Sequence, residues 1–170
     1  MALREVITHP DPRLSRPSDP LPEVNDEVRK LLRDLAETMY AAPGVGLAAP
    51  QLGVNLRAVV IDIGPVDQGG SGLIQIVNPV IESSEGSISW DEGCLSVPGM
   101  NEEVQRAVHV VVSGLDINGE PLRYDVEDFL AVAFQHEIDH LDGLLFFERL
   151  SPLKRKLLLK EYRKQQLENE

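Results

Sequence analysis

The sequence predicts an α+β fold, and three observations support this prediction. Segments 25–42 and 125–141 repeat apolar residues at helical spacing. Four shorter runs have the β-branched content or the alternation of strands, and Asn118-Gly119 between two of them is typical of a tight hairpin turn. No repeat, low-complexity tract or linker divides the 170 residues. We therefore expect one domain over residues 1–170.

The N-terminal segment should be extended before the first helix begins. Five prolines between residues 10 and 22 disfavour a helix there, so this part should wrap around the surface. Asn25 is the expected N-cap of a helix that runs to Ala42 and ends at Pro43-Gly44. The apolar face of this helix consists of Val28, Leu31, Leu32, Leu35 and Met39.

The predicted strands lie in the middle of the chain. Residues 56–63 and 73–81 are rich in β-branched side chains, and residues 122–126 follow the hairpin turn. Residues 104–112 alternate, which predicts a single strand. One face of that strand would carry Val104, Val108, Val110 and Val112.

Two further helices are predicted towards the C-terminus. The first covers 125–141 with Asp125 as its cap. Ser151 is a cap residue followed by Pro152, an arrangement typical of a helix start, so the last helix should run from Pro152 into the polar tail. The inward stripe of the 125–141 helix would be Phe129, Val132, Ala133 and His136.

Charge and hydropathy limit the partners. The formal net charge of −12 disfavours a general nucleic-acid-binding surface, so we expect no DNA partner. No apolar run is long enough to span a bilayer, and the first residues lack the apolar core of a signal peptide; a cytoplasmic protein without membrane contact is expected. The charge is uneven, because residues 151–164 hold one acid and six basic residues: Lys154, Arg155, Lys156, Lys160, Arg163 and Lys164.

The strongest chemical signal is an H-E-x-x-H pattern over residues 136–140. Residues four apart share a helical face, so His136 and His140 can reach one metal ion while Glu137 lies beside its water. A polar helical face with incidental histidines would give the same letters. A catalytic zinc site needs a third protein ligand. At the spacing where one class of zinc proteases places a third histidine, this chain has Phe146.

Three residues remain as candidates for the third ligand. Glu148 and Glu161 have no recognisable pattern around them, whereas Cys94 lies in Glu92-Gly93-Cys94-Leu95-Ser96. A nearby divalent cation would deprotonate the Cys94 thiol. A lone cysteine is otherwise most often a small buried hydrophobe, and one cysteine allows no intrachain disulfide.

A third segment, 44–51, is rich in small residues. Its sequence is Gly-Val-Gly-Leu-Ala-Ala-Pro-Gln, which lets the backbone pass close to another strand or to a substrate. Gln51 offers a side-chain amide donor. Taken alone, this segment would be a helix stop followed by a turn.

Taken together, segments 44–51, 92–96 and 135–143 resemble the three signature segments of the peptide deformylase family, in the same order and at similar separations. Residues 10–14 and 150–154 also resemble that family, so the resemblance covers most of the chain. With the predicted elements, it implies antiparallel strands packed around a central helix that carries the H-E-x-x-H pattern, with one N-terminal and one C-terminal helix.

The resemblance implies the following site. Cys94, His136 and His140 would hold one Fe²⁺ ion per chain, which Zn²⁺ or Ni²⁺ could replace. Glu137 would be the general base and acid. The Gln51 side-chain amide and the Leu95 backbone N–H would stabilise the developing oxyanion. The substrate groove and the pocket for formylmethionine would include Val45, Gly46, Phe129 and Val132.

The implied reaction is removal of the formyl group from the N-terminal formylmethionine of newly synthesised proteins, with release of formate. Its partners would be nascent polypeptides, and the basic C-terminal helix is a candidate landing surface on ribosomal RNA. Alternatively, that helix simply docks on the domain through Leu153, Leu157 and Leu158. Two other functions remain open: a zincin-type metallopeptidase that uses Glu137 in the same way, and a non-catalytic metal-binding module, which would need no such base.

One position departs from the family pattern. Members of the family often carry an arginine shortly after the cysteine motif, placed to meet the peptide backbone. The corresponding residue here is Asn101, and Arg106 lies further along. The sequence leaves open which of the two meets the substrate backbone.

Overall fold

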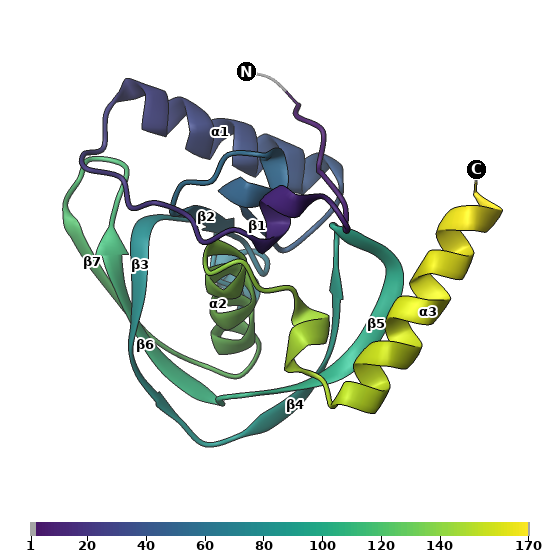
Figure 1. Ribbon diagram of the computed structural model, residues 1–170. Helices are drawn as coiled ribbons and strands as arrows, with labels where there is room; N and C mark the ends of the chain where they lie inside the picture. The colour runs from purple at the N-terminus through teal and green to yellow at the C-terminus, as the bar shows by residue number, and fades with distance from the viewer. Residues whose placement is uncertain (1–2, 170) are drawn as a thin grey trace.

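The computed structural model describes residues 3–169, so Met1, Ala2 and Glu170 of the expected 1–170 unit lie outside it. Within this range, five strands form one antiparallel sheet in the order β1-β2-β3-β6-β7, and two strands form another (Figure 1). The five-stranded sheet contains β1 (Gly46–Ala48), β2 (Ala58–Ile61), β3 (Ile74–Glu85), β6 (His109–Leu115) and β7 (Pro121–Glu127). The two-stranded sheet contains β4 (Ile88–Cys94) and β5 (Val97–Arg106).

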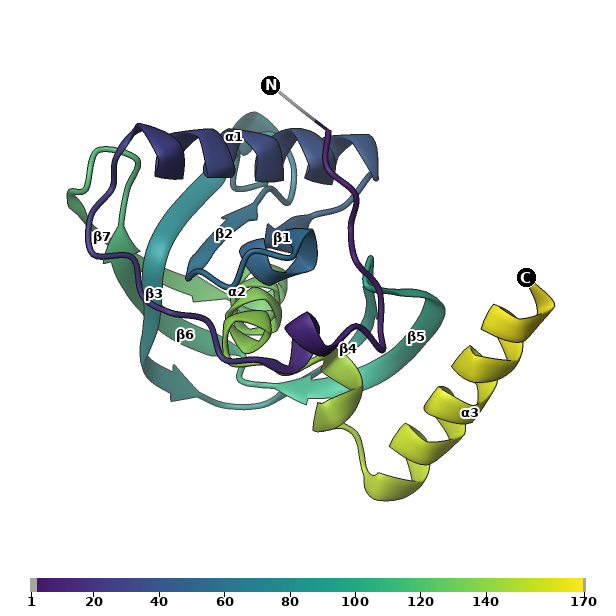
Figure 2. The same ribbon diagram turned by 45° about the horizontal axis from the view of Figure 1, so that its top comes forward.

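In the described part of the chain, three α-helices accompany the sheets: α1 (Asp26–Ala41), α2 (Asp128–Leu141) and α3 (Pro152–Glu168). Together with the antiparallel sheets, they agree with the predicted mixture of helices and antiparallel strands. Helix α2 contacts β1, β2, β6 and β7 of the larger sheet and β4 of the smaller one. Figures 1 and 2 show α1 across one end of the larger sheet and α3 projecting from the body beside β5.

Two of the three helix caps predicted from the sequence are confirmed. The Asn25 side chain accepts a hydrogen bond from Val28 N at 3.0 Å, and the expected apolar face of α1 is buried. The Ser151 side chain accepts one from Lys154 N at 3.3 Å, and Pro152 is the first residue of α3. Each cap satisfies a backbone N–H that the helix itself leaves unpaired.

Two predicted elements are wrong at their boundaries. Residues 104–112 are not one strand, because β5 ends at Arg106, β6 begins at His109 and the two strands belong to different sheets. The valines keep the same alternation on both sides of the break because each strand buries one face. Asp125 does not cap α2; it lies in β7 and pairs with Val111 of β6, and Glu127 is the N-cap.

The N-terminal segment is extended over the surface, as the prolines predict. Its backbone binds two segments of the site: Ile7 N donates to Gln51 O, and His9 N donates to Ser96 O, both at 2.8 Å. A short 3₁₀ helix (Pro12–Ser15) interrupts it and buries Leu14. The segment therefore helps to hold two of the three signature segments in place.

Helix α3 contacts the rest of the molecule through a small part of its surface. Leu158 and Tyr162 are buried, and Tyr162 Oη donates to His9 O at 2.8 Å. Leu153 and Leu157 are 67% and 58% exposed, so only one of the three leucines expected to dock does so. Within residues 3–169, no helix combines the length and the apolar content that crossing a membrane requires.

Candidate active site

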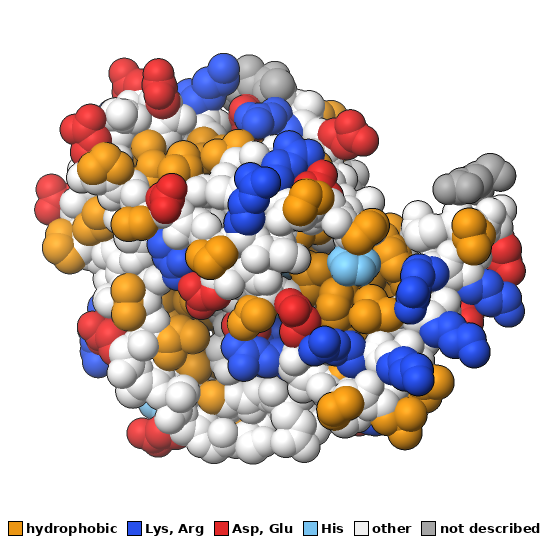
Figure 3. All heavy atoms as spheres, in the orientation of Figure 1, with side chains coloured by type: hydrophobic (Ala, Val, Ile, Leu, Met, Phe, Trp, Pro, Cys, Tyr) orange, Lys and Arg blue, Asp and Glu red, His pale blue; other side chains and the backbone are white. Residues whose placement is uncertain are grey.

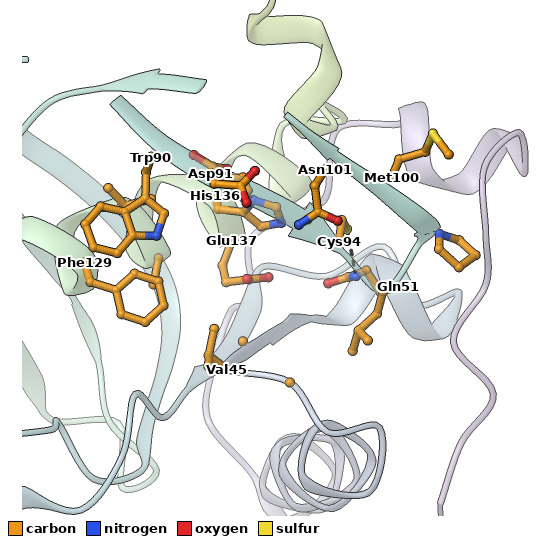
Figure 4. Close-up of a pocket in the computed structure, with 18 of the residues that line it drawn as sticks. Val45, Gln51, Trp90, Asp91, Cys94, Met100, Asn101, Phe129, His136 and Glu137 are labelled. Carbon is orange, nitrogen blue, oxygen red and sulfur yellow. Dashed lines mark hydrogen bonds and ion pairs between the residues drawn. The ribbon is translucent and has the colours of Figure 1, made fainter. Parts of the chain in front are cut away.

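The three signature segments meet at one cleft. The last turns of α2 supply His136, Glu137 and His140, the end of β4 supplies Cys94, and the 3₁₀ helix Ala49–Leu52 supplies Gln51. A cavity of about 570 Å³ opens beside them (Figure 4). Segments that lie far apart in the sequence thus contribute to one site.

The donor atoms of Cys94, His136 and His140 all lie within 4.8 Å of one another. Cys94 Sγ is 3.4 Å from His140 Nε2. Among residues 3–169, this is the group of His, Cys, Asp and Glu side chains that could hold a metal ion, which leaves Glu148 and Glu161 outside. A thiolate and two imidazoles suit a borderline-soft divalent ion and leave a fourth position open.

A carboxylate orients one of the imidazoles. Glu92 Oε1 lies 2.8 Å from His136 Nδ1, and Arg106 donates to both oxygens of Glu92 at 2.8 and 2.9 Å. Burial alone would raise the pKa of Glu92, but the hydrogen bonds from Arg106 and His136 hold that pKa below its usual value. An ionised Glu92 accepts the Nδ1–H of His136, so Nε2 is left to face the other donors.

The same hydrogen-bond network extends to Asp139 of α2. Asp139 accepts hydrogen bonds from Arg106 at 2.6 Å and from Arg149 at 2.7 and 3.0 Å. Arg106, Glu92 and Asp139 are almost completely buried, whereas the Arg149 side chain is 47% exposed. Two guanidinium groups therefore balance two carboxylates, which is the condition under which charges are tolerated in a protein interior.

Gln51 is held so that its amide N–H₂ faces the cysteine. Its Oε1 accepts a hydrogen bond from Ala48 N at 2.9 Å, which fixes the side-chain amide orientation. Its Nε2 donates to Ser96 Oγ at 3.1 Å and lies 3.6 Å from Cys94 Sγ. A donor beside the metal-binding group is where an oxyanion stabiliser would act.

Glu137 is a buried carboxylate at the floor of the cleft. Burial raises its pKa to about 7, against the opposing effect of His136. Its Oε1 has no hydrogen-bond partner among the described residues. The backbone of Gly46 lies directly beside it, since a Cβ at position 46 would overlap Oε2 and lie 2.8 Å from Cδ. A carboxylate whose pKa is near 7, and which has one oxygen without a hydrogen-bond partner, can take up and release a proton at physiological pH.

The other end of the cleft is apolar. Trp90 of β4 and Phe129 of α2 stack there, with ring centroids 5.0 Å apart and an interplanar angle of 14°. The cavity is lined by all four residues that the resemblance implied for substrate: Val45, Gly46, Phe129 and Val132. Leu95 also lines it.

Sequence reasoning missed two residues of the site, Trp90 and Glu92. Both lie on β4 at even spacing from Cys94, so they share its face of the strand. The sequence signal that could have identified both residues is their spacing of two and four residues before Cys94. It was hidden because residues 88–94 contain serine, glycine and two acids, which are weak strand formers.

The structure decides between the two candidates for the missing arginine. Arg106 does not line the cleft; it is buried and bound to Glu92 and Asp139, so of the two open alternatives it is not the one placed to meet a peptide backbone. Asn101 is exposed and lines the cavity. Its side chain approaches Gly93, where an added Cβ would lie 3.2 Å from Nδ2.

Comparisons with known proteins point to one family. The family model for polypeptide deformylase matches residues 3–156. The peptide deformylase of Thermodesulfovibrio yellowstonii is 45% identical over 163 residues, which cover 96% of this chain and 98% of that protein.

Two crystal structures of peptide deformylases have the same fold. The one from Legionella pneumophila superposes with a TM-score of 0.90 at 45% identity, over 99% of this chain and 98% of that one. The one from Acinetobacter baumannii, with Met-Ala-Ser bound, gives a TM-score of 0.82 at 31% identity, over 88% of this chain and 99% of that one. The chain therefore belongs to the peptide deformylase family, hydrolases that act on formyl-Met peptides.

Proposed function

We propose that this chain is a metal-dependent peptide deformylase that releases formate from the N-terminal formylmethionine of nascent proteins, with residues 1–170 as one catalytic domain. The observation that carries the proposal is the position of Glu137. It is a buried carboxylate with a pKa near 7, next to a group of one thiol and two imidazoles and at the floor of an open cleft. A purely structural metal site would be closed and would need no such acid.

The donor set fits a resident metal ion. Cys94, His136 and His140 would hold one Fe²⁺ ion, and Zn²⁺ or Ni²⁺ would suit the same thiolate and imidazole donors. A bound ion would polarise the formyl oxygen and make a hydroxide nucleophile available at neutral pH. In the metal-free protein, Glu137, Cys94 and Glu92 outweigh burial and raise the pKa of His136 well above its usual value, so loading the site should release a proton.

The chain's own residues then have distinct roles. Glu137 takes a proton from the attacking water and passes it to the amine nitrogen as the C–N bond breaks. The Gln51 amide and the Leu95 backbone N–H donate to the oxygen on which negative charge develops. Val45, Gly46, Phe129 and Val132 form the groove and the apolar pocket that hold formylmethionine. The binding of Met-Ala-Ser by the Acinetobacter relative supports this substrate class.

A zincin-type peptidase is the alternative, and two observations count against it. Phe146, at the position of a third histidine, is buried, and its ring stacks against His136 with a centroid distance of 6.4 Å. Cys94 would supply the third ligand, which such enzymes recruit downstream of the helix.

Two variants test the proposal together. Glu137→Gln should keep its metal and lose deformylation by about 10² or more, because the ligands remain while the proton carrier is gone. Cys94→Ser should lose metal, because a hydroxyl is a poorer anionic ligand than a thiolate. Glu103→Gln, an exposed residue of β5, is the matched control. Activity of Glu137→Gln within about tenfold of wild type, or full metal content in Cys94→Ser, would contradict the assignment.

We also propose that α3 binds ribosomal RNA. All six basic residues of this helix are exposed, and Figure 3 shows Lys and Arg side chains gathered along it on an otherwise acidic protein. The exposure of Leu153 and Leu157 supports a role outside the domain, because a helix that merely docked would bury them.

Co-sedimentation with ribosomes at 50 and 200 mM salt tests this partner. Binding should fall steeply with salt, and replacement of Lys160, Arg163 and Lys164 by Gln should reduce the slope while kcat/KM on a free formyl-tripeptide stays unchanged. The control replaces Lys30 and Arg33, exposed basic residues of α1, and should keep the wild-type slope. If the protein does not bind ribosomes at the lower salt, the proposal fails and α3 has a structural role only.

A further inference from the structure

A second hollow lies away from the active-site cleft, between the N-terminal segment and α3. It consists of two cavities of about 520 and 360 Å³ that share Leu159 and Arg163, so they adjoin along one face of the helix. Figure 3 shows a histidine and apolar side chains in this hollow and Lys and Arg side chains on its α3 side. We call it the α3 groove, with His9 and Pro10 on one side and Leu159 and Arg163 on the other. Both cavities are as large as pockets that hold small ligands, about 300–1,000 Å³.

The floor of the α3 groove is a ring surface held in a fixed position. Tyr162 Oη donates to His9 O at 2.8 Å, and the His9 imidazole packs against the rings of Tyr162 and Phe147 with centroid distances of 5.8 and 5.1 Å. Burial lowers the pKa of His9, against the opposing effect of Glu148, so the ring is uncharged at neutral pH. His9 is only partly buried and lines the cavity beside the exposed Pro10. A flat group that enters the groove can therefore contact both rings.

The rim of the α3 groove is basic. Arg155, Lys156 and Arg163 line it and are exposed. Among the described residues, no Asp or Glu lines either of its cavities, whereas Glu92 and Glu137 line the active-site cleft. Because the whole chain has a net charge of −12, the groove is a local basic site on an acidic protein. Its charge therefore favours a polyanion as the occupant.

Uncharged rings beside Lys and Arg are the combination that binds single-stranded nucleic acid, since bases stack on the rings and the cations meet the phosphates. We propose that the α3 groove binds an unpaired nucleotide of RNA, with its base against His9 and Pro10 and its phosphate at Arg163. A duplex fits less well, because its bases stack on one another and expose no ring face. Such a site rests on the RNA partner proposed for α3 and adds a base contact from outside that helix.

Fluorescence anisotropy of the metal-loaded protein with labelled RNA tests the proposal. At 50 mM salt, a single-stranded oligoadenylate should bind about fivefold or more tightly than the same strand paired with oligouridylate. His9→Ser should weaken binding of the single strand by about five- to thirtyfold without changing its salt dependence, because stacking releases no counterions. Arg163→Gln should reduce the salt slope by roughly one for both RNAs. Lys30→Gln on α1 is the matched control and should change neither property.

Two further variants separate a lost contact from a lost fold. His9→Phe keeps an aromatic ring at this position and should keep the preference for the single strand. Leu167 lines the groove and is 70% exposed, so Leu167→Glu leaves the core intact. The added carboxylate should repel the phosphate and weaken binding of the single strand. If His9→Ser does not fold, the result for Leu167→Glu decides.

Equal affinity for the two RNAs, or unchanged binding in both His9→Ser and Leu167→Glu, would overturn the proposal. Oligoglutamate that binds as tightly as the single strand would also overturn it and would indicate a site for acidic peptides. If ribosomes bind and the single strand does not, only the nucleotide site fails; if neither binds, the RNA partner of α3 fails as well. Formate release from formyl-Met-Ala-Ser is measured separately, so each result is distinguishable from a failure of the proposed deformylase function.

Discussion

Among single residues, Gly46 has the tightest constraint in the cleft. A side chain there would overlap the Glu137 carboxylate, so Gly46→Ala must displace either β1 or the carboxylate. We expect kcat/KM to fall by about 10² with metal content unchanged, because a small misplacement of a catalytic group is enough for such a loss. Gly44→Ala is the matched control, since the tightest contact of its Cβ, 3.1 Å, would be with the end of the flexible Leu95 side chain. Equal kinetics for both variants would contradict this account of the contact.

Glu137 should also make the metal-free protein sensitive to pH. Its pKa is about 7 in the folded protein and near 4.5 when unfolded, so the folded state holds the proton more tightly. This contribution to stability is fully present below pH 4.5 and is lost as the pH rises through 7. Relative to Glu137→Gln, the metal-free wild type should therefore lose up to about 3 kcal/mol between pH 4.5 and 8. Urea unfolding of both proteins at the two pH values measures this, and a constant difference would contradict it.

The candidate metal ligands could be predicted from the sequence because their residue types and their spacing are typical of metal sites. Two histidines four apart on a helix must share a face, and the Cys94 segment has a recognisable pattern. Glu92 and Trp90 could not be assigned in the same way, because their roles depend on which groups lie across the cleft. His136 and Phe129 are more than 35 residues away from them in the chain, and only the folded structure brings them together.

At the level of elements, the short 3₁₀ helix Phe146–Arg149 is linked to α2 by the hydrogen bonds from Arg149 to Asp139. Arg149→Met should weaken metal retention by about tenfold, because Asp139 would then depend on Arg106 alone and Arg106 also holds Glu92. Competition with a chelator measures retention. The matched control is Arg123→Met, whose exposed pair with Glu82 has no connection to the site. Equal retention in both variants would show that the Arg149 contact is structural only.

Helices could be predicted more reliably than strands, for a physical reason. The caps of α1 and α3 are local contacts, so Asn25 and Ser151 mark them in the sequence. The break between β5 and β6 is not local, because it depends on which sheet each half joins. The same holds for Asp125, whose capping tendency is overridden by pairing with β6.

On the scale of the whole molecule, the N-terminal segment and helix α3 meet beside the site. Tyr162 of α3 donates to His9 O, and His9 N donates to Ser96 O in the cysteine segment. Tyr162→Phe should cost about 1 kcal/mol and lower the Tm by roughly 2–4 °C. Tyr40→Phe removes a more exposed hydrogen bond, to Asp62, and should cost less. A thermal melt compares them, and equal shifts would argue against a buried hydrogen bond between α3 and the N-terminal segment.

The central claim is that this cleft hydrolyses a formyl amide and not an internal peptide bond. The most direct measurement incubates the metal-loaded wild type with formyl-Met-Ala-Ser and, separately, with unformylated casein. We predict formate release from the tripeptide at a rate that depends on Glu137, together with intact casein. Cleavage of casein without formate release would contradict it and would favour the peptidase, whereas no reaction on either substrate would favour a non-catalytic metal-binding module.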